Sequence, residues 1–262
     1  MKKIVVLLVL LLSLVGCTSK KTEDVAVEVK DSDYIKEKGK LVVGVTEFAP
    51  MDYIDNGEWV GFDADMAKAF AESLGVEAEI IVIDWDNKIL ELNAKSIDCV
   101  WNGMTITDEV RNAMEPSNAY ASNAQVVVMK KDKIANYPDV DSLKDLQFAV
   151  EAGSAGEEVV SALGLNYNSL NTQADTLLEV KAGTSDASAI DLLMAGAMIG
   201  EGTNYEDLGF TLPLNTEEYG VGFRKGSDLA DLLNDFFKAS YADGSMLACA
   251  EKYDIKDAII AQ

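Results

Sequence analysis

The sequence has 262 residues, of which 48% are hydrophobic, and its 22 Lys and Arg residues are outnumbered by 45 Asp and Glu residues, a formal net charge of −23. This length and composition allow one large or two modest domains with a sizeable buried core. The negative charge repels phosphate backbones, which argues against a nucleic-acid partner. The absence of histidine removes His-based nucleophile systems and His-ligated metal sites, and we expect neither a metal nor a cofactor.

The amino terminus has the pattern of an export signal. Two lysines precede an apolar run that ends at Leu14 and is too short to span a bilayer comfortably. The Leu-Val-Gly-Cys ending at Cys17 resembles a bacterial lipobox, in which the cysteine becomes the lipid-modified first residue of the mature protein; the alternative is a plain signal peptide with an incidental cysteine. We expect a signal peptide over residues 1–16, then the lipidated Cys17 and a flexible linker over 17–33. The protein would be lipid-anchored on the extracellular or periplasmic face of the cell membrane.

The first half of the remaining chain alternates predicted strands and helices, with order beginning near Tyr34. β-branched and apolar runs predict strands, whereas apolar residues at helical spacing predict helices. The predicted strands are 40–45, 80–83 and 99–101, the helices are 63–74 and 86–93, and a small hairpin covers 51–61. Strand–helix alternation of this kind implies a largely parallel sheet covered by helices.

The alternation then restarts, which predicts a second α/β unit. The predicted strands are 125–129, 147–150, 187–190 and 219–223, and the helices are 142–146, 154–163, one directly after 190, and 229–241. Two such blocks suggest two lobes with a cleft between them. Cys99 and Cys249 have no metal-like spacing, and whether they pair is left open.

Four predicted loops are candidates for a ligand site, because open α/β sheets bind ligands beyond the carboxyl ends of their strands. They are 46–50, 84–86, 102–107 and 153–156. Thr105 and Thr107 offer hydroxyls and Gly103 an accessible backbone, although Thr107 is equally suited to cap the following helix. The Gly-Ser-Ala-Gly turn at 153–156 offers free N–H groups before a helix, which suit an anion.

Three further side chains stand out in these loops and strand ends. Phe48 and Trp85 lie on loops, where they could enclose a planar or apolar ligand group or simply pack. Asp191 ends an otherwise buried strand, so its carboxylate either caps the next helix or pairs with a cation from a ligand.

The ordered set of motifs at 44–51, 61–65, 98–109, 186–191 and 218–227 resembles the solute-binding proteins of ABC transporters for polar amino acids. The resemblance runs from about Tyr34 to Tyr253. It implies an α/β, two-lobe periplasmic-binding-protein-like fold of type II, with discontinuous lobes joined by two hinge strands and a cleft between them. The implied lobes are 34–123 plus 222–262 and 124–221. The implied function is that a monomer binds a polar amino acid and delivers it to a permease.

The resemblance also assigns roles to individual residues. Asp191 would pair with the ligand ammonium, helped by the Gly103 carbonyl and the Thr105 hydroxyl. The Ser154 and Ala155 N–H groups would hold the ligand carboxylate. Phe48 and Trp85 would flank the ligand side chain, and Asn102 and Glu47 could recognise that side chain.

One position departs from the family pattern. The family has Thr-x-Thr-x-x-Arg, whose arginine clamps the ligand carboxylate, but here that position is Val110 and the arginine follows as Arg111. One step along a helix rotates a side chain by about 100°. Arg111 is therefore either a re-aimed ligand contact or an ordinary exposed charge.

Two other functions fit the same scaffold. One is a dehydratase of cyclic acids, with Glu47 or Asp191 as the proton donor. The other is an extracellular sensing or adhesion lipoprotein that reuses the fold without transport.

Overall fold

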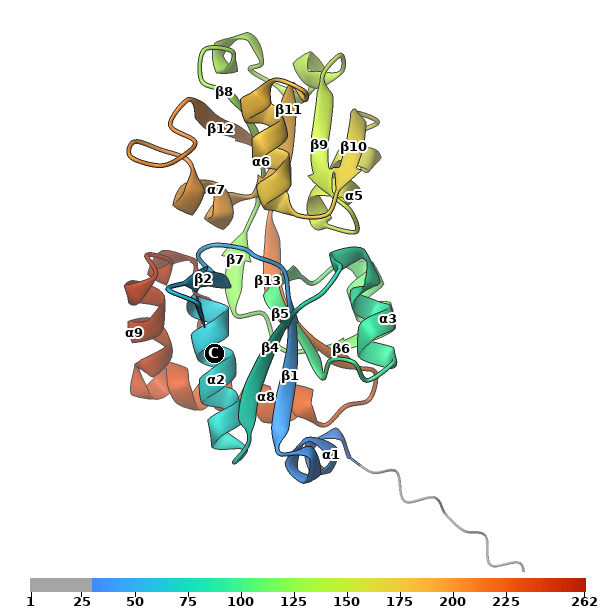
Figure 1. Ribbon diagram of the computed structural model, residues 1–262, viewed down its shortest axis with the longest axis vertical. Helices are drawn as coiled ribbons and strands as arrows, with labels where there is room; N and C mark the ends of the chain where they lie inside the picture. The colour runs from blue at the N-terminus through green and yellow to red at the C-terminus, as the bar shows by residue number, and fades with distance from the viewer. Residues whose placement is uncertain (1–29) are drawn as a thin grey trace, which may run out of the picture.

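The computed structural model describes residues 30–262 as two α/β lobes, each built around its own sheet (Figure 1). The expected signal peptide, Cys17 and nearly all of the expected linker lie outside the described residues. None of the helices between residues 30 and 262 is long and apolar enough to cross a membrane.

The first lobe contains a sheet in the order β4-β1-β5-β13-β6, with β7 also paired to β13. β1 is parallel to both β4 and β5, whereas β13 is antiparallel to β5. The strands are β1 (Lys40–Val45), β4 (Glu77–Val82), β5 (Cys99–Thr105), β6 (Met114–Pro116), β7 (Ala121–Asn123) and β13 (Glu217–Arg224), beside the hairpin β2 (Tyr53–Asp55) and β3 (Glu58–Val60). The helices are α1 (Asp31–Lys38), α2 (Phe62–Ser73), α3 (Lys88–Asn93), α4 (Asp108–Ala113), α8 (Leu229–Asp243) and α9 (Ser245–Lys252), with short 3-10 turns at Trp85–Asn87 and Lys256–Ala258.

The second lobe contains a five-stranded sheet in the order β10-β9-β11-β8-β12. β9 is parallel to β10 and β11, and β8 is antiparallel to β11 and β12. The strands are β8 (Gln125–Lys130), β9 (Gln147–Glu151), β10 (Asn166–Leu170), β11 (Ala187–Asp191) and β12 (Leu208–Pro213). The helices are α5 (Ala155–Ala162), α6 (Gln173–Ala182) and α7 (Leu192–Met198), with 3-10 turns at Ile134–Asn136 and Val140–Leu143.

The chain crosses between the lobes twice, from β7 to β8 and from β12 to β13, and both crossings lie in the narrow neck of Figure 1. β13 pairs with β7 from its first residue, Glu217 opposite Asn123. The lobe boundary expected between 221 and 222 therefore falls inside β13.

All but one of the expected strands and helices are confirmed, with β1 matching residue for residue. The helix expected at 142–146 is wrong, since the structure has a 3-10 turn at Val140–Leu143. The missed elements include α1, β6, β10, α6, β12 and α9. β10 and β12 are edge strands with largely exposed or half-buried residues, so they lack the continuous apolar run that marks an inner strand.

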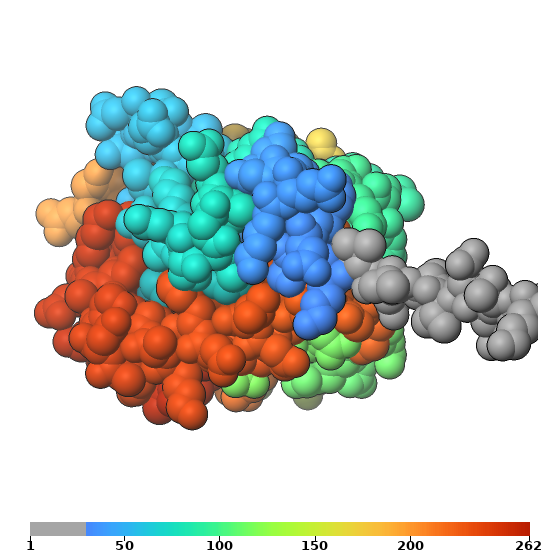
Figure 2. All heavy atoms as spheres, turned by 90° about the horizontal axis from the view of Figure 1, so that it is seen from below, coloured from blue at the N-terminus to red at the C-terminus, as the bar shows by residue number. Residues whose placement is uncertain are grey.

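Order begins earlier than expected, because α1 starts at Asp31 rather than near Tyr34. The Ser32 N–H and hydroxyl donate to the Asp228 carboxylate at 3.0 and 2.5 Å. The Asp31 carboxylate pairs with Arg224 at 3.0 Å. Figure 2 shows this blue start of the described chain lying beside the orange segment that contains α8.

The two cysteines in the described part of the chain carry free thiols. Cys99 is buried in β5 and Cys249 is half-buried in α9. The disulfide left open by the sequence is thus not formed in this structure.

Candidate functional site

A cavity of about 470 Å³ lies between the lobes and is lined by both. The first lobe contributes Phe48, Trp85, Lys88, Asn102, Gly103, Met104, Thr105, Thr107, Glu109 and Val110. The second contributes Glu151, Gly153, Ser154, Ala155, Glu157, Glu158, Ser161, Tyr167, Gln173 and Asp191. Eight of the ten residues proposed from the sequence as ligand contacts therefore surround one space; the other two, Arg111 and Glu47, do not line it.

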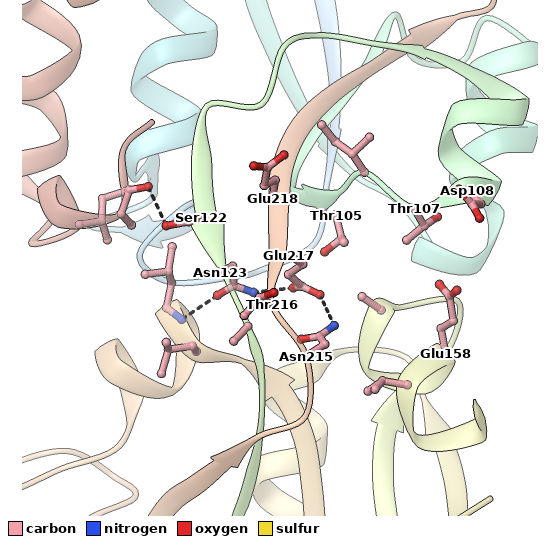
Figure 3. A pocket seen from close by; sticks show the side chains of 18 of the residues that line it. Thr105, Thr107, Asp108, Ser122, Asn123, Glu158, Asn215, Thr216, Glu217 and Glu218 are labelled. Atoms are coloured by element: carbon pink, nitrogen blue, oxygen red, sulfur yellow. Dashed lines mark hydrogen bonds between the residues drawn. The ribbon is translucent and has the colours of Figure 1, made fainter. Parts of the chain in front are cut away.

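A larger hollow of about 1080 Å³ adjoins this cavity and includes Arg111 among its lining residues. Figure 3 shows it running along the two interlobe crossings, where Asn123, Asn215 and Glu217 point toward one another. Thr105, Thr107, Ala155 and Glu158 line both spaces, so the two spaces are continuous at this edge.

Asn102 holds the loop that carries Phe48. Its Oδ1 accepts from the N–H and the hydroxyl of Thr46, both at 2.9 Å, and its Nδ2 donates to the Thr46 carbonyl at 2.9 Å and to Asp52 at 2.8 Å. A side-chain amide has two acceptor sites and two N–H groups, so these four bonds occupy all of them. Asn102 therefore positions the 46–52 loop, and the expectation that it reads the ligand side chain is not supported by this geometry.

Gly103 lets Phe48 approach the strand closely. Its φ is +54°, and a Cβ there would lie 2.5 Å from the Phe48 ring. Its N–H donates to the Asp63 carboxylate at 2.6 Å, and the Tyr120 hydroxyl donates to the same oxygen at 2.7 Å. Burial raises the pKa of Asp63 to about 7. The backbone of β5 at the cavity is thus fixed by a buried acid in α2.

The two loop aromatics form part of the cavity wall and are themselves buried. Phe48 and Trp85 are exposed by only 2% and 7%. Phe48 contacts Tyr219 edge to face, with ring centroids 6.4 Å apart. They offer two apolar surfaces on the first-lobe side of the cavity.

Asp191 is the buried acid that ends β11, and it does not cap α7, which rules out the capping alternative. One oxygen accepts from Asn123, Gln125 and Tyr219 at 2.6, 3.1 and 2.5 Å, and the other accepts from Gln173 at 2.5 Å. All four donors are neutral, and Asp191 makes no ion pair within residues 30–262. A buried carboxylate surrounded only by neutral donors is suited to receive a cation.

The surroundings of Asp191 disfavour the ionised form of its carboxyl group. Burial, followed by the nearby Glu217 carboxylate, raises the pKa of Asp191 to about 8. A bound cation would favour the ionised form.

Glu151 is a second buried acid of the cavity, and it was missed by the sequence reasoning. It ends β9, is 2% exposed, and its Oε1 has no hydrogen-bond partner in the described chain. Burial raises its pKa to about 8, with the charge of Asp191 the next cause. Its sequence signal was an acid directly after the apolar run 148–150, which is the same signal that identified Asp191.

Ser154 and Ala155 begin α5 at the cavity, but they offer different groups. The Ser154 hydroxyl caps the helix by accepting from the Glu157 N–H at 3.1 Å. The Ser154 N–H donates to the Glu151 carbonyl at 3.2 Å, so it is used inside the turn. The Ala155 N–H has no acceptor in the described chain and is the amide best placed for a carboxylate.

The Val110 and Arg111 side chains face different spaces. Thr107 caps α4, accepting from the Val110 N–H at 3.2 Å, which confirms capping for Thr107. Val110 is 2% exposed and lines the smaller cavity, whereas Arg111 is exposed and lines only the larger hollow. The one-residue shift noted in the sequence therefore brings an apolar side chain to the cavity.

Lys88 is the cation of the cavity and was also missed. It is 5% exposed, and its Nζ donates to the Gly153 carbonyl at 2.8 Å and to the Trp85 carbonyl at 3.3 Å. Leu90, an apolar residue of the same helix, is instead 66% exposed. The only signal was that Lys88 opens a helix directly after the Trp85 loop.

Two remaining expectations concern Glu47 and metals. Glu47 is exposed and lines neither the cavity nor the larger hollow. No group of three or more His, Cys, Asp or Glu side chains suited to hold a metal ion occurs within residues 30–262.

Comparison with known proteins gives a consistent set of relatives. The family model of bacterial extracellular solute-binding proteins, family 3, matches residues 41–256. The arginine-binding extracellular protein ArtP of Bacillus subtilis is 30% identical over 82% of this chain and 86% of its own length. The L-cystine-binding protein TcyJ of Escherichia coli is 30% identical over 84% of each chain. The crystal structure of a mutant of ArgBP from T. maritima superposes with a TM-score of 0.80 at 33% identity, covering 85% of this chain and 98% of that one.

Proposed function

Because the chain belongs to the bacterial extracellular solute-binding proteins of family 3, we propose that it captures a polar amino acid outside the cytoplasmic membrane and delivers it to the permease of an ABC transporter. The observation that carries this proposal is the cavity between the lobes, in which an unpaired buried acid, an unused helix N–H and two aromatic side chains face one space. These are the groups that an ammonium, a carboxylate and a side chain require.

The ligand ammonium would bind Asp191. The neutral donors around that carboxylate leave its charge uncompensated, and a ligand ammonium would supply the missing cation. The Thr105 hydroxyl and the Gly103 backbone line the same cavity from the first lobe. The Ala155 N–H at the start of α5 would bind the carboxylate, where the helix dipole favours negative charge.

The charge of the cavity favours a ligand whose side chain is also cationic. Five acids and one lysine line it: Glu109, Glu151, Glu157, Glu158, Asp191 and Lys88. Glu151 is buried with an unpartnered oxygen, so a cationic side chain would have an acceptor in the second lobe. Two relatives support this preference, the arginine-binding extracellular protein ArtP and an arginine-bound mutant of ArgBP from T. maritima.

We further propose that the mature chain is a monomer tethered by a lipid on Cys17, and that its lobes close about the β7–β8 and β12–β13 crossings. Mass spectrometry of the mature amino terminus tests the tether. A diacylated Cys17 is expected, and a Cys17→Ala variant should be released from the membrane fraction. An unmodified amino terminus on membrane-free protein would contradict the tether without affecting the ligand site.

A thermal-shift screen of the mature protein against the common amino acids tests the main proposal. At a hundredfold excess over Kd, a ligand that binds only the folded state adds about 2.7 kcal/mol of stability, which is easily seen as a rise in Tm. We expect the largest rise with a cationic amino acid. If millimolar concentrations of every α-amino acid leave Tm unchanged, the proposal fails.

An enzyme on the same fold is the second candidate, because Glu151 and Asp191 share the cavity and each has a pKa raised to about 8. A carboxyl group protonated near neutral pH can act as a general acid. Incubating the protein with each stabilising ligand and following that ligand by NMR distinguishes the two functions. A binding protein leaves the ligand unchanged over hours, whereas an enzyme converts it.

A further inference from the structure

We propose that Lys88 binds the ligand's α-carboxylate, in the role that an arginine at position 110 would otherwise have. The inference rests on the proposed amino-acid ligand and adds a binding residue to that site. Three observations on Lys88 support it: its unused hydrogen-bonding capacity, its uncompensated charge, and its position beside the start of α5.

The first observation is that the Lys88 ammonium is only partly hydrogen-bonded. An ammonium has three N–H donors. In the described chain two of them are used, toward the carbonyls of Gly153 and Trp85. The Nζ also lies 5.0 Å from the centre of the Trp85 ring, so the group is held at the cavity wall. One donor remains for a ligand in the cavity that Lys88 lines.

The second observation is that this buried charge lacks a direct counter-ion. Lys88 is 5% exposed, yet no carboxylate lies within 4.0 Å of its Nζ in residues 30–262. Burial accordingly lowers the pKa of Lys88, although more distant acids partly oppose that effect. An unpaired buried ammonium is costly, and an anion entering the cavity would offset that cost.

The third observation is where the Nζ lies. The Gly153 carbonyl that accepts from Lys88 at 2.8 Å belongs to the turn that leads directly into α5. The Ala155 N–H, which has no acceptor in the described chain, begins that helix two residues later. A positive helix end and an ammonium therefore border the same part of the cavity, an arrangement suited to a carboxylate.

The contact also joins the two lobes. Lys88 begins α3 in the first lobe, and Gly153 precedes α5 in the second. A carboxylate held by both Lys88 and the Ala155 N–H would be bound from both sides of the cleft. Carboxylate binding would then favour the closed arrangement of the lobes.

The remaining cationic candidate does not share this position. Arg111 is exposed and lines only the larger hollow, while Val110 presents an apolar side chain to the cavity. Among the described residues, Lys88 is the only lysine or arginine that lines the cavity.

The test compares each amino acid that stabilises the wild-type protein with its own α-carboxamide, which lacks the carboxylate charge. Kd values for both are measured by calorimetry with wild type, Lys88→Gln, Lys88→Met and the control Arg111→Gln. Lys88→Gln removes the charge but keeps donors for the Gly153 and Trp85 carbonyls. A charged hydrogen bond is worth about 1.5–3 kcal/mol, so wild type should prefer the acid over the amide by roughly tenfold or more.

In both Lys88 variants we expect that preference to fall to within about threefold, whereas Arg111→Gln keeps the wild-type ratio. A purely structural role for Lys88 would weaken acid and amide equally and leave the ratio unchanged, which would overturn the inference. So would a wild-type protein that binds acid and amide alike, or loss of the ratio in Arg111→Gln. If one of the two Lys88 variants does not fold, the ratio in the other decides. Failure of the proposed function is distinct, because wild type would then bind no amino acid at all.

Discussion

The carboxylates of Asp191 and Glu217 share the side-chain amide of Asn123, whose Nδ2 lies 2.6 Å from an oxygen of each. The Gln125 Nε2 joins the same two oxygens at 3.1 and 2.9 Å. Asp191 faces the cavity, and Glu217 begins β13 at the return crossing between the lobes. The proposed ammonium-binding acid is thus linked to the interlobe crossing by neutral amides, and Figure 3 shows the part of this link from Asn123 to Glu217.

Replacing Asp191 with Asn should weaken the binding of a stabilising amino acid by roughly thirtyfold or more, because a charge-assisted hydrogen bond becomes a neutral one. Calorimetric Kd values check this. Glu218→Gln is the matched control, since Glu218 is exposed and lines only the larger hollow. Equal losses in the two variants would point to the overall negative charge instead of Asp191.

The stability of the ligand-free protein should fall as pH rises from 5 to 8, and Glu151→Gln should reduce that slope. With a pKa of about 8 against an ordinary 4.5, Glu151 binds its proton in the folded state and loses it on unfolding in this window. The folded state then holds more protons, so raising the pH favours unfolding by up to about 1.4 kcal/mol per pH unit for one group. Above pH 8 this contribution levels off.

Urea unfolding at several pH values measures the Glu151 effect as a difference between variants. The difference is needed because the pKa values of Asp191 and Asp63 are also raised by burial and contribute with the same sign. Glu158→Gln on the exposed side of α5 is the control and should keep the wild-type slope. A Glu151→Gln slope equal to that of wild type would show that Glu151 is ionised in the folded protein.

Gly103→Ala should destabilise the protein by roughly 1–3 kcal/mol, because the position has a positive φ and its new Cβ would meet the Phe48 ring. Displacing Phe48 should also weaken ligand binding. Gly196→Ala in α7 is the control: nothing lies within 4 Å of its Cβ position, and alanine should be neutral or stabilising by up to about 1 kcal/mol. The free energy of unfolding of both variants is measured by chemical unfolding. Equal values for Gly103→Ala and Gly196→Ala would contradict the close approach of Phe48 to Gly103.

Adding Val110→Arg to Lys88→Gln should restore part of the preference for an amino acid over its α-carboxamide, since Val110 faces the cavity. The double variant is compared with Lys88→Gln alone by calorimetry. Placing the arginine at exposed Asn112 instead should restore nothing. If neither arginine changes the ratio, position 110 does not reach the carboxylate.

Much of the fold was predictable because inner strands carry continuous apolar runs, as in β1 and β9, whose neighbours bury both faces. Strand β10 was not predictable, because an edge strand of polar residues resembles a loop in sequence. Most of the residues that line the cavity were predictable, because they lie at the ends of strands and the starts of helices.

The roles of Asn102 and Lys88 were not predictable from sequence alone. The side-chain amide of Asn102 is fully hydrogen-bonded to residues 50 and 56 positions away in the sequence. Lys88 is buried against a turn of the other lobe, 65 positions away. Such long-range partners leave no local pattern. The same holds for Asp191, whose acid character was visible but whose four donors were not.

The anchoring of α1 has a mechanical consequence. Asp31 and Ser32 are tied to Arg224 and Asp228, at the end of the first lobe that lies farthest from the second (Figure 1). A force applied at residue 30 is therefore transmitted to the first lobe through the Asp31–Arg224 ion pair and the Ser32–Asp228 hydrogen bonds. It does not act on the interlobe crossings. If Cys17 carries the proposed lipid tether, the second lobe is the part that moves, and its movement does no work against that tether.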